Sequence, residues 1–207
     1  MTGYVATVSG SAPSTHDRVS EAALLRFADQ GVAATSLDDL ARSIGVTKQT
    51  VLYHFGSKDG LVRAVAQRGA NELAGVLGDA AAHSEPGWDR VESIVRAAFG
   101  LAVQRPELLS LMREVSRLGA PVSEVVLADL QPLIDRALGS LSEGMAAGVF
   151  KTADPRLLLV SAYAAVAGVV TDPEALRAVG LELDVRVAAR LRRTVLDFLA
   201  ASLLPTR

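Results

Sequence analysis

A short run of polar side chains near residue 50 has the residue types that bind nucleic-acid bases and phosphates. The run consists of Lys48, Gln49, Thr50, Tyr53, His54 and Lys58. Lysine and glutamine side chains hydrogen-bond to purine edges in the major groove of DNA. Tyrosine, histidine and lysine side chains donate hydrogen bonds or charge to phosphates, which fixes register without reading sequence. A helix that enters the major groove reads bases with its first residues, so the order of these side chains predicts DNA recognition.

Two short helices joined by a glycine turn are expected to position these side chains. Thr35 or Ser36 caps the first helix, and Asp38 completes a capping-box pattern with Thr35. The apolar face of this helix consists of Leu37, Leu40, Ala41 and Ile44. Gly45 supplies the positive φ that a tight exit from the helix requires. The pattern predicts a first helix that packs on the rest of the chain through one face.

The second helix begins after its expected cap, Thr47, and directs apolar side chains inward. The inward side chains are Val51, Leu52 and Phe55. A DNA-binding helix-turn-helix has a small residue in its first helix, then a tight turn, and then an apolar residue that returns to the core. The spacing of these three features is matched by Ala41, Gly45 and Val51. The pattern also fits a small helical hairpin with an ordinary solvated polar face. The predicted DNA-binding residues are Thr35, Ser36, Arg42, Thr47, Lys48, Gln49, Thr50, Tyr53, His54 and Lys58.

The segment from Val19 to Lys58 resembles the N-terminal domain of TetR-type transcriptional regulators. The matching positions are Gly45, Val46, Thr47, Lys48, Thr50, Tyr53, His54, Phe55, Ser57 and Lys58. Two positions depart from the family pattern: Gln49 stands where the family often has glycine, and Leu52 where an aromatic residue is common. The resemblance implies a repressor that binds DNA as a dimer and responds to a small molecule. Because of these two departures, the resemblance does not identify the DNA sequence that the protein prefers.

The bulk charge of the chain does not by itself indicate a nucleic-acid partner. The formal net charge of the 207 residues is −2 at pH 7, whereas nucleic-acid-binding domains are usually basic. A positive surface must therefore be local. We expect Arg42, Lys48 and Lys58 to form it together with helix N-termini.

The helical periodicity continues beyond the motif and predicts an all-α protein. Residues 1–13 are small, uncharged and broken by glycine, and we expect a disordered arm. Residues 14–60 are predicted to form a three-helix helix-turn-helix DNA-binding domain, whose first helix runs from Ser14 to Gln30 and ends at Gly31. Residues 61–207 are predicted to form a helical effector-binding and dimerisation domain. The expected long helices of this domain cover residues 61–82, 88–104, 106–118, 121–148, 154–170 and 184–204.

A ligand pocket is expected in the C-terminal domain. Helical domains bind ligands between helices, in mostly apolar cavities with a few polar groups. The candidate pocket residues are Trp88, Arg96, Phe99, Met112, Arg113, Met145 and Tyr163. Each of them also fits ordinary core packing. Aromatic residues make up only 4% of the chain, which favours an aliphatic or flexible effector over a flat polycyclic one.

The last two long helices have the composition of interface helices. Residues 154–170 are almost wholly apolar, and residues 184–204 divide into a polar stripe and an apolar stripe. A helix that is apolar all round lies in a core or in an interface. Both a four-helix bundle with a symmetry mate and a single monomeric core fit this pattern, and the family resemblance favours the homodimer. The candidate interface residues are Ala162, Val166, Leu191, Val195, Phe198, Leu199 and Ser202.

The sequence does not support a metal site, a disulfide, an enzyme active site or a membrane span. The chain has no cysteine, and His16, His54 and His83 lie far apart, so we expect no metal site and no disulfide. Glu114 and Asp135 belong to separate helices and are expected to be surface charges. Phosphate-binding loops and nucleophile elbows do not occur, and we expect neither an enzyme nor a cofactor. No apolar run has the length of a membrane span, and we expect a cytoplasmic protein.

Together with the resemblance, these patterns predict a regulator of transcription that acts as a repressor. It is expected to bind palindromic double-stranded operator DNA as a homodimer, and to be released by a small-molecule effector of apolar character. A second class of protein stays open. A helical small-molecule or partner-binding protein would carry the same motif without using it for sequence-specific DNA binding.

Overall fold

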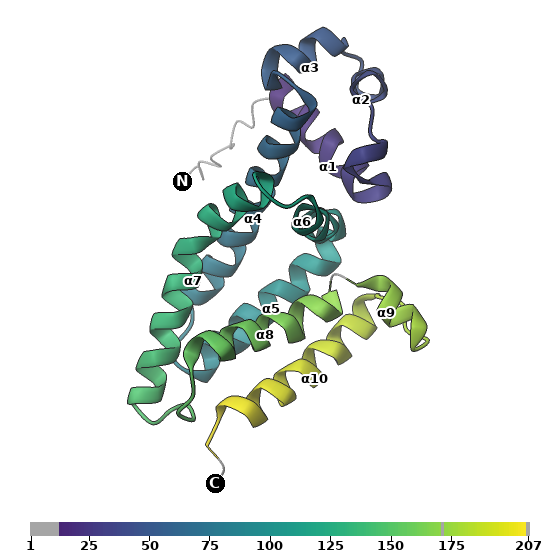
Figure 1. Ribbon diagram of the computed structural model, residues 1–207. Coiled ribbons are helices and arrows are strands. Elements are labelled where there is room, and N and C mark those ends of the chain that lie inside the picture. The colour runs from purple at the N-terminus through teal and green to yellow at the C-terminus, as the bar shows by residue number, and fades with distance from the viewer. Residues whose placement is uncertain (1–12, 171, 206–207) are drawn as a thin grey trace, which may run out of the picture.

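The fold is a bundle of helices with the three N-terminal helices at one end. The computed structural model describes residues 13–170 and 172–205, which contain ten helices and no strand. The helices are α1 Thr15–Ala34, α2 Leu37–Ser43, α3 Lys48–Phe55, α4 Lys58–Ala82, α5 Trp88–Gln104, α6 Pro106–Leu118, α7 Val122–Ala146, α8 Pro155–Val170, α9 Pro173–Ala178 and α10 Val185–Leu203. The predicted all-α fold is confirmed (Figure 1). Most of the expected N-terminal arm, residues 1–12, lies outside the described residues.

Gly31 interrupts α1 where the sequence predicts the end of the first helix. Its φ is +81°, a left-handed conformation that favours glycine. Ser14 caps the start of α1, since its side chain accepts a hydrogen bond from the Asp17 N–H. After the break the chain passes through Thr35 and turns into α2. Short-range signals in the sequence therefore set both ends of the regular part of α1.

Helix α4 connects the N-terminal helices to the rest of the bundle (Figure 1). It starts after Ser57, whose side chain accepts a hydrogen bond from the Gly60 N–H. Along its length it packs against α5 and α7. At its far end, Arg90 of α5 donates to the Ala81 carbonyl at 3.1 Å. This bond satisfies one of the carbonyls that the C-terminus of a helix leaves without a partner.

Buried apolar side chains form two clusters along the bundle. The first joins α1, α2, α3, α4 and α6, and its fully buried members include Val19, Leu40, Val51, Leu61 and Leu111. The second lies mainly between α5, α8 and α10. Burial of a leucine or valine side chain contributes about 1.5–3 kcal/mol. The first cluster continues past residue 60 through α4 and α6, so the three N-terminal helices share a core with the helices that follow them. The predicted domain limits stay a prediction.

The short helix α9 is absent from the helices expected from the sequence. Asp172 caps it by accepting a hydrogen bond from the Ala175 N–H, and a proline occupies the first helical position. Aspartate followed by proline is a recognisable helix start. A helix of six residues is too short for apolar periodicity to reveal it.

The apolar face of α10 is divided between two roles, and the dimer prediction requires a correction. Val195 and Leu199 are only 6% and 3% exposed within the single chain, where they pack in the second cluster. They are core residues, because α10 must bury one face against α5 and α8 of its own chain. The other expected interface residues that pack against this cluster are Ala162, Val166 and Leu191. Phe198 and Ser202 lie on the exposed side of α10.

Candidate nucleic-acid interface

A glycine turn sets the direction in which the chain leaves α2 and enters α3. Gly45 has a φ of +70°. Its N–H and that of Val46 donate to two carbonyls in the last turns of α2. These two bonds form a Schellman motif, which closes the C-terminus of a helix. Arg18 of α1 also donates to the Ile44 carbonyl at 2.6 Å. The turn between the two helices is therefore held by α1 as well as by its own backbone.

Helix α3 is anchored through one face. Thr47 caps it, since its side chain accepts a hydrogen bond from the Thr50 N–H at 3.1 Å. Val51 is fully buried in the first cluster, and Phe55 packs against the same cluster. The Phe55 ring also stacks on His16 of α1, with 4.6 Å between the ring centroids. The predicted cap and these two inward side chains are confirmed.

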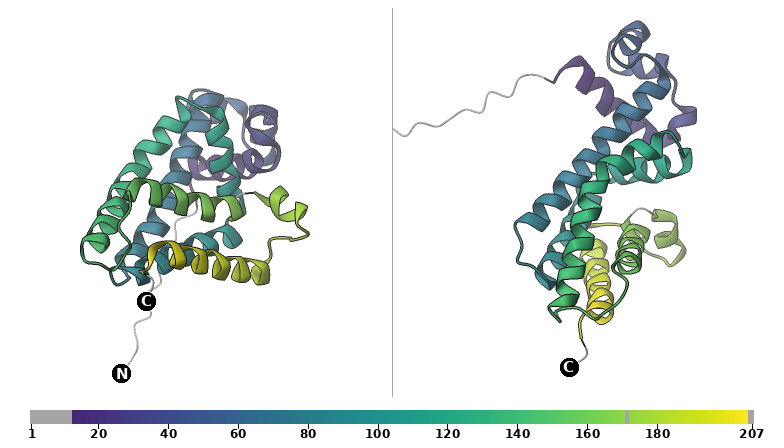
Figure 2. Two further views of the ribbon diagram at one scale, coloured as in Figure 1. Left: turned by 60° about the horizontal axis from the view of Figure 1, so that its bottom comes forward. Right: turned by 60° about the vertical axis from the view of Figure 1, so that its left-hand side comes forward.

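The other face of α3 presents polar side chains to solvent. Among the predicted DNA-binding residues, the exposed ones are Arg42, Thr47, Lys48, Gln49, Tyr53 and His54. Those that are partly buried are Ser36, Thr50 and Lys58. Tyr53 is 84% exposed, so its aromatic ring contributes little to the core of the chain. Figure 2 shows that α2 and α3 project at one end of the molecule, away from the C-terminal helices.

Thr35 does not belong to this surface, and its predicted DNA contact requires a correction. The residue is 1% exposed. Its hydroxyl donates to the Gly31 carbonyl at 2.9 Å and accepts from the Gln30 amide at 3.3 Å. The hydroxyl thus satisfies a carbonyl next to the break in α1, where no regular helical bond is available. Ser36, and not Thr35, caps α2 by accepting from two N–H groups of its first turn.

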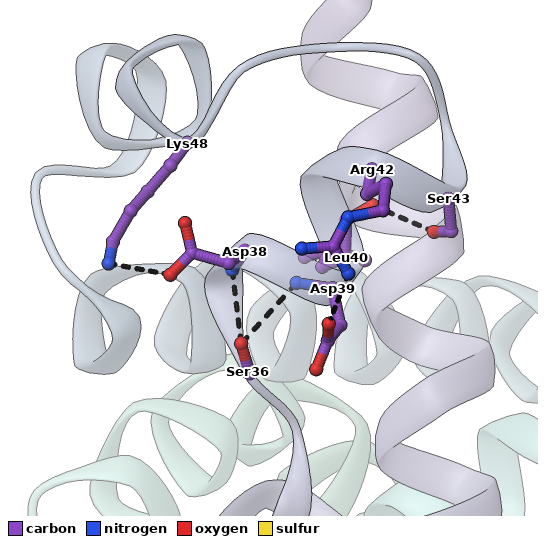
Figure 3. Close-up of polar contacts among 7 residues, drawn as sticks. All are labelled: Ser36, Asp38, Asp39, Leu40, Arg42, Ser43 and Lys48. Carbon is purple, nitrogen blue, oxygen red and sulfur yellow. Dashed lines mark hydrogen bonds and ion pairs between the residues drawn. The ribbon is translucent and has the colours of Figure 1, made fainter.

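Each of the three cations expected on this surface is bonded to another group of the same chain. Lys48 Nζ lies 2.8 Å from Asp38 Oδ2, and Arg42 Nη1 lies 2.7 Å from Asp39 Oδ1 (Figure 3). Lys58 Nζ donates to a backbone carbonyl at the end of α1 at 3.2 Å. The two carboxylates are absent from the residues predicted to form the interface. Two adjacent acidic residues in the first turn of α2 are the signal that could have identified them.

An ion pair between α1 and α4 helps to hold the helix-turn-helix motif against α4. Arg68 Nη1 of α4 lies 3.2 Å from Asp17 Oδ1 of α1. The Ser14 hydroxyl donates to the other Asp17 oxygen at 2.7 Å. This hydrogen bond, together with the Arg68 charge, holds the pKa of the Asp17 carboxyl below its usual range. Asp17 therefore stays ionised at neutral pH and keeps its bond to α4.

The predicted pocket residues do not converge on one cavity. Those in or against the second cluster are Trp88, Phe99 and Met145. Met112 packs against the first cluster, and Arg113 lines a surface pocket between α1 and α6. Arg96 is exposed and pairs with Glu92, and Tyr163 is 68% exposed. Residue type alone does not say which helices meet, and the seven side chains are divided among the second cluster, the first cluster and the surface.

Asp129 of α7 is a polar feature that the sequence does not single out. Its Oδ2 atom is buried and has no hydrogen-bond partner among the described residues. A buried oxygen without a donor is unfavourable, and such atoms call for an explanation.

Residues 13–170 and 172–205 lack two further features. No group of three His, Cys, Asp or Glu side chains is placed to hold a metal ion. None of the helices there combines the length and the apolar composition that crossing a bilayer requires.

The N-terminal helices match a known protein family. Residues 20–65 match the family described as bacterial regulatory proteins, tetR family. The regulatory protein RaaS of Mycobacterium tuberculosis is 29% identical over 144 residues, which are 69% of this chain and 63% of RaaS. The regulator SrpR of Pseudomonas putida is 40% identical over 57 residues, which are 28% of this chain and 27% of SrpR. The chain thus spans less than two thirds of the length of these curated relatives.

Solved structures share the fold over nearly the whole chain. A transcriptional regulator from Saccharomonospora viridis in complex with choline superposes with a TM-score of 0.78 at 17% identity, covering 92% of this chain and 98% of that one. AibR in complex with isovaleryl coenzyme A and operator DNA superposes with a TM-score of 0.76 at 16% identity, covering 90% of this chain and 98% of AibR. Identities at this level show the fold alone.

The family match falls on the same helices that carry the exposed polar surface. It begins within α1, spans α2 and α3, and ends within α4. RaaS and SrpR are both regulators of transcription of the helix-turn-helix type. The segment that carries this surface, residues 20–65, is therefore similar to the tetR family of bacterial regulatory proteins.

Proposed function

We propose that this protein is a cytoplasmic transcriptional repressor that binds an inverted-repeat operator as a homodimer and leaves it when a small molecule binds. The observation that carries the proposal is the exposed start of α3, where Lys48 and Gln49 face solvent. The turn at Gly45 and the buried Val51 hold this helix in place. A helix presented in this way reads major-groove bases with its first residues.

The side chains of this surface divide into two roles. Gln49 is exposed and has the amide that addresses adenine in the major groove, so it is proposed to read bases. Tyr53, His54 and Lys58 follow on the next turns and are proposed to contact phosphates. The complex of AibR with operator DNA supports this use of the shared fold.

The homodimer is proposed to form through the exposed apolar face of α8 and α10. Leu157, Val160 and Tyr163 of α8 are 69%, 65% and 68% exposed, and Phe198 of α10 is 58% exposed. The two helices pack side by side (Figure 1). Monomeric proteins rarely expose large contiguous apolar patches. Two-fold pairing of this face would make a four-helix bundle and present two copies of α3 to successive major grooves.

The effector is proposed to bind between the C-terminal helices. The second cluster supplies apolar walls for such a site. An effector with a mainly apolar body fits this cluster. The complexes of two proteins of the same fold with choline and with isovaleryl coenzyme A support a ligand-responsive role. By reciprocity, an effector that weakens operator binding must itself bind more weakly in the presence of operator.

Selection of bound sequences from random duplex DNA tests the proposal. The full chain is incubated with the duplex pool, and bound fragments are enriched over several rounds and sequenced. Enrichment of an inverted repeat with half-sites about one helical turn apart supports the homodimeric DNA-binding function.

The second candidate, a helical protein that binds a ligand or partner without reading DNA, predicts the opposite result. A folded dimer that enriches no sequence would contradict the repressor proposal and favour that candidate. The control is the same selection with the Gln49→Ala variant, because the motif that this variant enriches should differ from that of the wild type.

A further inference from the structure

The ion pair between Lys48 and Asp38 joins the first turns of α2 and α3 at the exposed surface. Lys48 is the first residue of α3, and Asp38 lies in the first turn of α2, ten residues earlier. The ammonium and the carboxylate are 2.8 Å apart, and both side chains are about half exposed. Figure 3 shows the Lys48 side chain extended toward α2, with its nitrogen at the Asp38 oxygen. The contact is therefore formed before DNA arrives.

The ion pair leaves Lys48 with two competing partners on the surface that DNA is proposed to meet. A phosphate oxygen and the Asp38 carboxylate are both anions that accept from the same ammonium. If Lys48 moves to a phosphate, Asp38 remains beside the DNA backbone without its cation, and like charges repel. A half-exposed pair of this kind is weak enough to exchange when a better-placed partner arrives.

We propose that Asp38 is a positioning and specificity-determining residue, which acts by restraining Lys48 and penalising DNA complexes held by phosphate contacts alone. The inference rests on the proposed operator-binding function. Non-specific complexes depend almost wholly on phosphate neutralisation, whereas specific complexes add base contacts. A carboxylate next to Lys48 therefore weakens non-specific binding more than operator binding. Asp38 raises the ratio of the two affinities.

Neutralising Asp38 should change affinity in a way that depends on the DNA sequence. One additional free cation steepens the slope of log affinity against log salt by about 0.9. In Asp38→Asn we expect this change for a scrambled duplex, together with affinity for that duplex raised about 3-fold to 10-fold at low salt. Affinity for the operator should rise less, so the ratio of operator affinity to scrambled-duplex affinity should fall.

The matched control is Asp29→Asn. Asp29 is exposed on α1, and its side chain has no ion pair or hydrogen bond among the described residues, so its neutralisation changes the net charge by the same amount without freeing Lys48. The affinity ratio of this variant should equal that of the wild type. Asp38→Glu keeps the carboxylate and should restore most of the ratio. Asp38→Ser repeats the neutralisation with a residue that suits the first turn of a helix, in case Asp38→Asn folds poorly.

The experiment measures dissociation constants by fluorescence anisotropy for the enriched operator and for a scrambled duplex over a series of salt concentrations. The Asp38 and Asp29 variants are compared in the wild-type background, and Asp38→Asn is repeated in a Lys48→Ala background. There the affinity ratio should no longer respond to Asp38, because the residue acts through Lys48. An unchanged ratio in both neutral Asp38 variants, or an equal fall in the Lys48→Ala background, would overturn the inference.

Failure of the underlying function gives a different result. If the wild-type protein itself binds both duplexes equally, no operator recognition exists and the repressor proposal falls. If the wild type discriminates and the Asp38 variants discriminate equally well, the repressor proposal stands and only the role of Asp38 is overturned.

Discussion

Arg105, at the junction of α5 and α6, donates from Nη2 to Glu21 of α1 at 3.1 Å, across 84 residues of sequence. The same guanidinium lies 3.1 Å from Glu72 of α4 and also contacts Glu107 of α6. Burial alone would lower the pKa of Arg105, but its bond with Glu107 and the charges of Glu72 and Glu21 raise it overall. One cation therefore joins carboxylates from three helices and connects α1 of the N-terminal motif to α4 and α6.

Arg105→Gln should destabilise the protein more than the loss of an ordinary surface ion pair. The variant leaves three carboxylates facing one another, and we expect the free energy of unfolding to fall by about 1–3 kcal/mol at neutral pH. Denaturant unfolding of the two proteins measures this difference.

Arg96→Gln is the charge-matched control for this variant. Arg96 forms a single exposed pair with Glu92 one helical turn away, and its loss should change the free energy of unfolding by less than about 0.5 kcal/mol. Equal losses in the two variants would show that the Arg105 contacts add nothing to the stability of the fold.

Asp154, just before α8, should titrate at unusually low pH. Hydrogen bonds from the Arg156 side chain and from its backbone N–H lower the pKa of Asp154 to about 2. Because the folded-state pKa lies below the unfolded value of about 3.9, the stabilisation is fully present above about pH 4 and is lost as the pH falls through about 2. NMR titration of the Asp154 carboxyl measures the midpoint. In Arg156→Gln the midpoint should move up toward the unfolded value, and an unmoved midpoint would exclude Arg156 as the cause.

Much of the helical framework follows from local sequence signals, and the motif follows with it. Gly31 and Gly45 adopt the positive φ values that the helix ends require. Ser14 and Thr47 cap the helices they precede. These features depend on residues within one helical turn of each other, which is why one sequence is sufficient to predict them.

The errors arise where the answer depends on what a residue packs against. Periodicity places Val195 and Phe198 on one broad apolar side of α10, but only tertiary packing decides that Val195 faces α5 and α8 while Phe198 faces solvent. Thr35 has a side chain suited to a phosphate contact, yet it is buried, because its hydroxyl bonds to the Gly31 carbonyl at the break in α1. The pair of Lys48 and Asp38 joins two helices, and no property of either helix alone reveals it.

The two sides of α10 should respond differently to an introduced charge. Phe198→Glu adds a charge to the exposed face and should give a folded monomer, because the charge would be buried unpaired only in the proposed dimer. Val195→Asp adds a charge to the core and should lower the thermal midpoint strongly. Sedimentation velocity and thermal melting separate the two effects. A Phe198→Glu variant that sediments as the wild-type dimer would exclude this face as the interface.

Gln49 and Lys58 should affect DNA binding in different ways. Loss of a base contact in Gln49→Ala should change the preferred sequence, at about 1–3 kcal/mol for the base pair concerned. Lys58→Ala should weaken all sequences similarly and reduce the salt slope by about one. Binding measurements on a panel of single-base operator variants distinguish the two patterns. A changed preference in Lys58→Ala with an unchanged one in Gln49→Ala would reverse the assigned roles.

Two glycines of α7 should respond oppositely to alanine. A Cβ at Gly144 would lie 2.7 Å from Cε2 of the buried Phe150 ring, whereas a Cβ at Gly139 would meet no atom within 4 Å. Gly139→Ala should stabilise the protein by up to about 1 kcal/mol through helix propensity. Gly144→Ala should instead destabilise it by about 1–2 kcal/mol, because overpacking exceeds that gain. Denaturant unfolding of both variants measures the sign, and stabilisation by both would show that Phe150 moves aside freely.

The length of α4 gives the molecule a mechanical property. This helix is 25 residues long and has one end at the DNA-facing motif and the other beside the C-terminal helices. At 1.5 Å per residue it is a rod about 37 Å long, so a tilt of about 5° about one end moves the other by about 3 Å. In the proposed homodimer the two displacements add to about 6 Å, against about 34 Å between successive major grooves. A rotation of α4 that is too small to disturb any helix would therefore move both copies of α3 in the proposed homodimer out of alignment with the major grooves of the duplex.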